Sequence, residues 1–206
     1  MKKLFAAVCM VLVAGNAFAW GIPSVMDTGV DTGPLSKRAE AVKDKVGKAT
    51  ISLAEGLADV LEMAGKAQDA AALRDQVLAV KSDSHDFAKV ESLSNAIGVS
   101  QNKVSGIALS KVIPLVTAKA KLPSAMVNIG SAVTTDMSVA KETAALAQEI
   151  PKAASSIKNP MKIKELTDAA GAIKFVASQI IPQAQSMASL TKELTDYAVS
   201  NNIALR

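Results

Sequence analysis

The sequence predicts an all-α protein: an elongated antiparallel helical bundle built from coiled-coil-like hairpins with proline kinks. Apolar residues recur at steps of three and four over most of the chain, and no segment alternates as a strand would. The apolar positions favour Ala, Gly and Met. Because small side chains bury little area, worth roughly 25 cal/mol per Å², stability must come from long helix contacts.

Residues 1–19 have the organisation of a cleaved secretory signal peptide. Lys2 and Lys3 precede the apolar run 4–13, and the motif Ala17-Phe18-Ala19 provides a cleavage site that would leave Trp20 as the first residue. The alternative is an uncleaved membrane anchor, but the run is about half of the roughly 20 residues that a membrane span needs. We therefore expect an exported protein, periplasmic or extracellular.

Removal of the leader changes the composition of the chain. Cys9 is the only cysteine, so the mature protein is expected to have neither disulfides nor thiol chemistry. Lipidation of Cys9 fits poorly because Val8 precedes it where a small residue is needed. The formal charge falls from +4 to +2 with the loss of two lysines, and aromatic residues make up only 3% of the chain. A nucleic-acid-binding surface is therefore not expected.

Residues 20–34 predict an irregular lead, rich in Gly and Pro. They contain the triplet Asp-Thr-Gly twice, starting at Asp27 and Asp31. An aspartic protease needs two carboxylates that face each other across a cleft, and triplets four residues apart on one segment cannot do so. We interpret the segment as a linker, with weak cation binding by the two aspartates as the alternative.

Residues 35–206 are expected to form a single helical bundle domain, beginning with a helix of about 48 Å. Charged residues occupy the side opposite its apolar stripe, and Ile51 is the exception because it falls on the polar side. The stripe consists of Leu35, Ala39, Val42, Val46, Ala49, Leu53, Leu57, Val60, Ala64 and Ala67.

The middle of the chain predicts shorter helices. A second helix covers residues 69–80, and the Ser and Asp residues of 82–86 can cap a third helix. Gly98 is expected to end that third helix, and Ser100 to cap another one, kinked at Pro114 and ended at Pro123. The inward residues of the second and third helices are Leu73, Val77, Val80, Phe87, Val90, Leu93 and Ile97.

Two seven-residue repeats organise the C-terminal half. The second repeat keeps its phase through Pro182, which predicts either one long helix kinked there or two nearly collinear helices. Pro151 and Pro160 are expected to bracket a short connection, with Asn159 as a helix cap. The first repeat is Met126, Gly130, Val133, Met137, Ala140, Ala144 and Ala147. The second is Ile163, Leu166, Ala170, Ile173, Ala177, Ile180, Ala184, Met187, Thr191, Leu194 and Ala198.

His85 is the only histidine, and its surroundings do not suit catalysis. A relay with Ser84 and Asp86 would need consecutive side chains to converge, although they point in different directions. A metal site with Asp83 and Asp86 is the alternative, but three neighbouring weak ligands do not close a coordination shell. An exposed histidine in a capping turn is the preferred interpretation.

No other motif points to catalysis or to a cofactor. The sequence contains no P-loop, no G-x-G-x-x-G and no H-E-x-x-H. Glu55 and Asp59 lie four residues apart, and a solvated helix face is the preferred interpretation of that pair. We expect a protein that is not an enzyme and that holds neither a metal nor a cofactor.

The remaining functions are forms of binding. The preferred hypothesis is an exported structural or interaction protein whose partner is another protein or a second copy of itself. The alternative is a membrane- or lipid-associating protein, either pore-forming-like or a carrier of an apolar ligand. Residues 122–135 and 175–191 carry no charge, but both stretches are shorter than a bilayer span.

Overall fold

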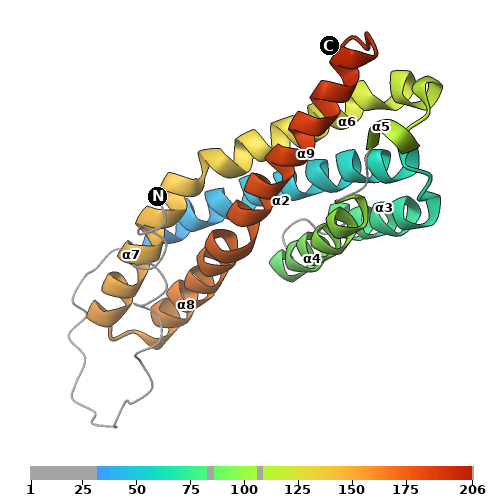
Figure 1. Ribbon diagram of the computed structural model, residues 1–206. Helices are drawn as coiled ribbons and strands as arrows, with labels where there is room; N and C mark the ends of the chain where they lie inside the picture. Colours follow the sequence, from blue (N-terminus) through green and yellow to red (C-terminus); the bar gives the residue numbers. More distant parts are fainter. Residues whose placement is uncertain (1–31, 83–85, 106–108, 206) are drawn as a thin grey trace.

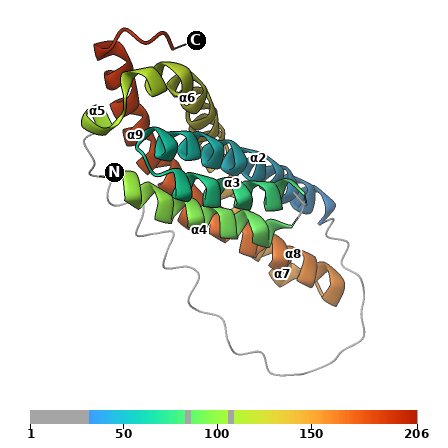
Figure 2. The ribbon, with the colours of Figure 1, turned by 90° about the vertical axis from the view of Figure 1, so that its right-hand side faces the viewer.

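The computed structural model describes residues 32–82, 86–105 and 109–205, and every regular element in these ranges is helical. The all-α class is therefore confirmed. The molecule is elongated, with its long helices running along one axis (Figures 1 and 2). In chain order the elements are α2 (Gly33–Met63), α3 (Ala67–Lys81), α4 (Phe87–Val104), α5 (Leu109–Val112), α6 (Leu115–Ser138), α7 (Ala140–Ser156), α8 (Pro160–Phe175), the π-helical turn η1 (Val176–Ile180) and α9 (Ile181–Ser200).

The long helix α2 is central and contacts α3, α4, α6, α7 and α8. Its predicted stripe is confirmed, because all the stripe positions from Ala39 to Val60 are buried. The prediction for Ile51 is wrong: its side chain is half-buried and packs against the core. The reason is that α2 is covered by neighbours on more than one side, so its apolar surface is wider than a single stripe.

A glycine ends α2 earlier than its apolar pattern predicts. The stripe continues to Ala67, but Gly65 has φ +76° and the Lys66 amide donates to the Leu61 carbonyl at 2.8 Å. This left-handed residue reverses the chain, as glycine does at helix C-termini. The chain then enters α3, whose predicted inward residues are all buried.

Helix α4 begins as predicted and ends later than predicted. The Asp86 side chain accepts a hydrogen bond from the Ala88 amide at 3.0 Å and caps the helix. The helix continues past Gly98 to Val104, so the expected end at Gly98 and the cap at Ser100 are both wrong. Val104 is only 2% exposed, and this burial outweighs the roughly 1 kcal/mol that a helical glycine costs.

Prolines interrupt the chain less often than the sequence predicts. Pro114 precedes α6 as its N-cap, so it begins a helix rather than kinking one. Pro123 lies inside α6 and Pro151 lies inside α7, so neither ends a helix. Each follows a buried residue, Leu122 and Ile150 respectively. Core packing on both sides of each proline offsets the lost amide hydrogen bond.

The C-terminal helix passes through Pro182 without a break, as the phase of its repeat predicts. Asn159 caps α8 by accepting a hydrogen bond from the Met161 amide at 3.0 Å. In η1 the Ile181 amide donates to the Val176 carbonyl, five residues back, so the turn is wider than an α-helical one. This turn stands immediately before Pro182, and α9 follows directly from it.

The first C-terminal repeat has the predicted spacing but the wrong phase. Met137 and Ala144, two of its positions, are exposed. The buried stripe lies one residue earlier along the chain and includes two polar residues, Asp136 and Thr143. It consists of Leu122, Ala125, Ile129, Ala132, Asp136, Val139, Thr143, Leu146 and Ile150.

The buried residues form two hydrophobic clusters that share α2. One lies among the C-terminal part of α2 and helices α3, α4, α6 and α9. The other lies among the N-terminal part of α2 and elements α7, α8 and η1. Phe87 packs against both clusters. On the α6–α7 side the boundary falls between Ala132 and Val139, which is where Asp136 is buried.

Candidate functional site

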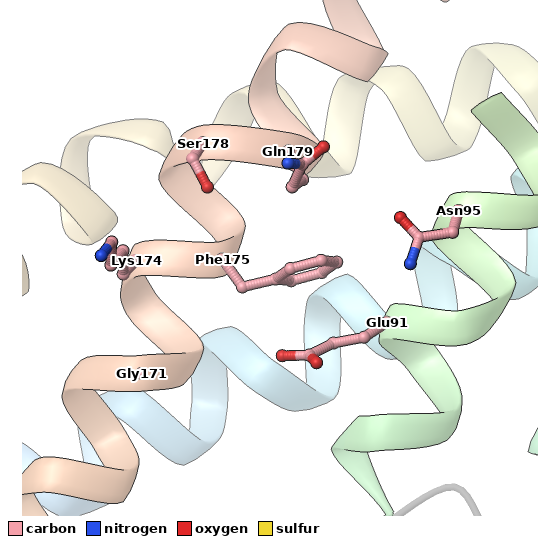
Figure 3. A pocket seen from close by; sticks show the side chains of 7 residues that line it. All are labelled: Glu91, Asn95, Gly171, Lys174, Phe175, Ser178 and Gln179. Atoms are coloured by element: carbon pink, nitrogen blue, oxygen red, sulfur yellow. The ribbon is translucent and has the colours of Figure 1, made fainter.

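A hollow of about 340 Å³ opens between α4 and the junction of α8 with η1. Figure 3 shows Glu91 and Asn95 of α4 on one side and the side chains of the α8–η1 junction on the other, with the Phe175 ring between them. The lining residues are Glu91, Asn95, Gly171, Lys174, Phe175, Ser178 and Gln179. The hollow is therefore formed by segments far apart in the sequence.

The local sequence explains the shape of the hollow. The π-helical turn places Ser178 and Gln179 at its rim, and such turns recur at functional sites. Gly171 has no side chain to fill the space one helical turn earlier. The Phe175 ring meets Phe87 edge to face, with ring centroids 5.7 Å apart, and this contact fixes the ring.

The two walls of the hollow are fastened together next to it. Ser94 of α4 is 3% exposed, and its hydroxyl donates to Gln183 Oε1 at 3.1 Å. Gln183 Nε2 in turn donates to the Ser94 carbonyl at 2.9 Å. This reciprocal pair holds α4 against α9, so the rim is part of a fixed scaffold.

The polar groups of the rim are available to a ligand. Among the described residues, no hydrogen bond or ion pair joins the side chains of Glu91, Asn95, Lys174, Ser178 and Gln179 to another protein group. Together they offer one carboxylate, one ammonium group, two amides and a hydroxyl. The arrangement can bind a polar partner group around an aromatic surface.

Most of the residues singled out from the sequence lie outside the described part of the chain. These are the cleavage-site residues Ala17, Ala19 and Trp20, the aspartates Asp27 and Asp31 of the N-terminal lead, and Asp83, Ser84 and His85 of the capping turn. Asp86 is described, and it serves as the α4 cap. In the described ranges no three His, Cys, Asp or Glu side chains are grouped so that they could hold a metal ion.

Glu55 and Asp59 form interhelical ion pairs, so the interpretation of this pair as a solvated face is wrong. The Lys81 ammonium lies 2.5 Å from Glu55, and the Arg74 guanidinium lies 2.7 Å from Asp59. Arg74 also contacts Glu62, which is paired with Lys121 of α6 as well. Hydrogen bonds from Lys121 and then Arg74 lower the pKa of Glu62. These carboxylates hold α2 against α3 and α6.

Asp136 is the functional candidate that the sequence reasoning missed. It is 1% exposed, and its Oδ1 has no hydrogen-bond partner among the described residues. Burial raises the pKa of this carboxyl from 3.8 to about 7, because a low-dielectric site disfavours the charged form. The sequence signal is a carboxylate in phase with Ile129 and Ala132. The predicted repeat does not include it, because that repeat lies one residue later along the chain.

The uncharged stretches 122–135 and 175–191 contribute to the protein core. Leu122, Ile129, Ile180 and Met187 are among their fully buried side chains. Within the described ranges, no helix combines the length and apolar character that crossing a membrane requires. Comparisons with protein-family models, with curated proteins and with solved structures returned no match to this chain.

Proposed function

We propose that this protein is an exported, non-catalytic helical protein that binds another protein at the hollow between α4 and η1. The observation that carries the proposal is the set of unpaired polar side chains around Phe175, held on a fixed scaffold. The organisation of residues 1–19 supports export.

The chemistry of the hollow favours a protein partner over a small apolar ligand. Sites for small molecules enclose most of the ligand and are lined mainly by apolar groups. This hollow is open, and Phe175 is its single large apolar residue. The hollow suits one anchoring side chain of a partner protein. Polar groups of the partner next to that side chain would then contact Glu91 and Lys174.

We also infer that α2 pairs with α6 and α7 as an antiparallel, coiled-coil-like seam. The seven-residue spacing of the buried stripe supports this geometry. So does the order of the contacts, because partners later in the chain meet earlier residues of α2. These contacts are Lys121 with Glu62, Ile129 beside Gly56, and Glu142 with Arg38. A seam of this kind provides a stiff frame for the hollow.

Site-specific photo-crosslinking in the protein's own cells tests the proposal. A photoreactive residue at Gln179 should give one discrete protein adduct, and the same residue at Glu165 should give none. Glu165 is the matched control because it is exposed on α8 outside the hollow. A second variant, Ser178→Arg, should abolish the adduct by filling the rim.

Three results would contradict the binding proposal: no adduct from Gln179, equal adducts from both positions, or an adduct unaffected by Ser178→Arg.

Export is tested separately by sequencing the N-terminus of the protein recovered from those cells. We expect Trp20 as the first residue, and an intact Met1 would contradict export by signal cleavage.

A further inference from the structure

The elbow between α5 and α6, residues 111–119, carries three exposed aliphatic side chains that belong to neither hydrophobic cluster. Val112, Leu115 and Val116 are 42%, 43% and 83% exposed. Ile113, between them, is 5% exposed, and its carbonyl accepts a hydrogen bond from the Tyr197 hydroxyl at 3.1 Å. This hydrogen bond fastens the elbow to α9. The segment from α5 to the start of α6 lies at one end of the molecule (Figures 1 and 2).

The charged residues in the stretch of sequence around the elbow are all positive. Residues 92–135 contain four lysines and neither Asp nor Glu. Lys103 is paired with Asp69, and Lys121 is paired with Glu62. The other two, Lys111 and Lys119, belong to the elbow.

Both elbow lysines are exposed, and neither is paired with a carboxylate of the described residues. Lys119 follows Leu115 by four residues and Val116 by three, so all three share one face of α6. Lys111 directly precedes Val112. In the neighbouring helix α9, Asp196 directly precedes Tyr197, which contacts the elbow. The Asp196 carboxylate is already paired with Lys192 at 2.7 Å. The apolar surface is thus flanked by free positive charge.

We propose that the elbow docks on an anionic lipid surface, with Val112, Leu115 and Val116 entering the headgroup boundary and Lys111 and Lys119 contacting lipid phosphates. A projecting apolar edge flanked by lysines is the pattern of interfacial membrane binding. A protein interface buries about 800 Å² on each side, more than three partly exposed aliphatic side chains supply. The surface is distinct from the hollow, so the inference does not depend on the proposed function.

Vesicle co-sedimentation tests the inference with protein purified as its own cells process it, so that every variant has the same N-terminus. The vesicles are phosphatidylcholine alone or phosphatidylcholine with about 30% phosphatidylglycerol, at about 0.1 M salt. We expect binding to the anionic vesicles only. Replacing Lys111 and Lys119 by Gln should weaken it by about fivefold for each lysine.

The apolar contribution is tested with a matched pair of substitutions. Val116→Ser should weaken binding about tenfold. Met161→Ser is the control, because Met161 is also 83% exposed but lies on α8. The charge control replaces Lys37 and Lys45, exposed on α2, by Gln.

Each failure of these comparisons overturns the inference. It is wrong if the processed protein stays in the supernatant with anionic vesicles, or if neutral vesicles bind it equally well. It is also wrong if the control variants lose as much binding as the elbow variants. Should Val116→Ser change the circular dichroism spectrum, the lysine variants alone decide, because exposed lysines contribute little to folding.

Discussion

Replacing Asp136 by asparagine should stabilise the protein at alkaline pH and change its stability little in acid. The carboxyl is 1% exposed, and Oδ1 has no partner among the described residues. It lies between the two hydrophobic clusters, on the stripe that α6 and α7 turn toward the core. Asparagine has nearly the same shape and cannot ionise, so the substitution isolates the cost of the buried charge.

The sign of the effect follows from the raised pKa. Burial raises the pKa of Asp136 from 3.8 to about 7, so the folded state binds the proton more tightly than the unfolded state. The resulting stabilisation is fully present below about pH 4 and falls as the pH rises toward 7. At about 1.4 kcal/mol per pH unit, the loss by pH 8 amounts to about 4 kcal/mol. The asparagine variant should not show this loss.

Urea unfolding followed by circular dichroism measures the difference between wild type and variant at about pH 4 and about pH 8. Taking the difference at each pH cancels the titration of the other carboxylates. Asp168→Asn is the matched control because Asp168 is exposed on α8, and it should shift the free energy of unfolding by less than about 0.5 kcal/mol. If D136N is no more stable than wild type at about pH 8, the reasoning on burial is wrong.

Four further substitutions test the packing and one helix cap by urea unfolding. Gly56→Ala should destabilise by about 1–3 kcal/mol, because the added Cβ would lie 2.7 Å from Ile129 Cγ1. Gly130→Ala should stabilise the protein by about 0.5–1 kcal/mol, because a Cβ added at Gly130 would meet no atom within 4 Å. If both glycine substitutions changed the free energy of unfolding equally, the close contact at Gly56 would be refuted. Leu166→Ala, at a fully buried position, should cost about 2–5 kcal/mol, and a cost under about 1 kcal/mol would contradict its burial. Asp86→Ala should cost about 1 kcal/mol through the lost α4 cap, and an unchanged midpoint would show that the cap is dispensable.

The sequence determined the helical class and much of the helix pattern. Periodicity alone identified the buried face of α2 and the continuity of the C-terminal helix through Pro182, because a side-chain stripe is a local property of one helix. The caps at Asp86 and Asn159 were equally readable, since each bonds an amide two residues away. Local rules failed where burial opposed them, as at Gly98, Pro123 and Pro151.

The candidate site was beyond the reach of sequence reasoning for a different reason. Its walls come from α4 and from η1, and no pattern within either segment indicates that they meet. The phase of the α6–α7 stripe was ambiguous because several neighbouring positions carry small or apolar residues, and only packing against α2 selected the one that buries Asp136. The sequence by itself therefore determined the all-α class, the buried face of α2 and the starts of α4 and α8. The tertiary structure decided which face of each helix is covered, because burial depends on neighbours that are distant along the chain.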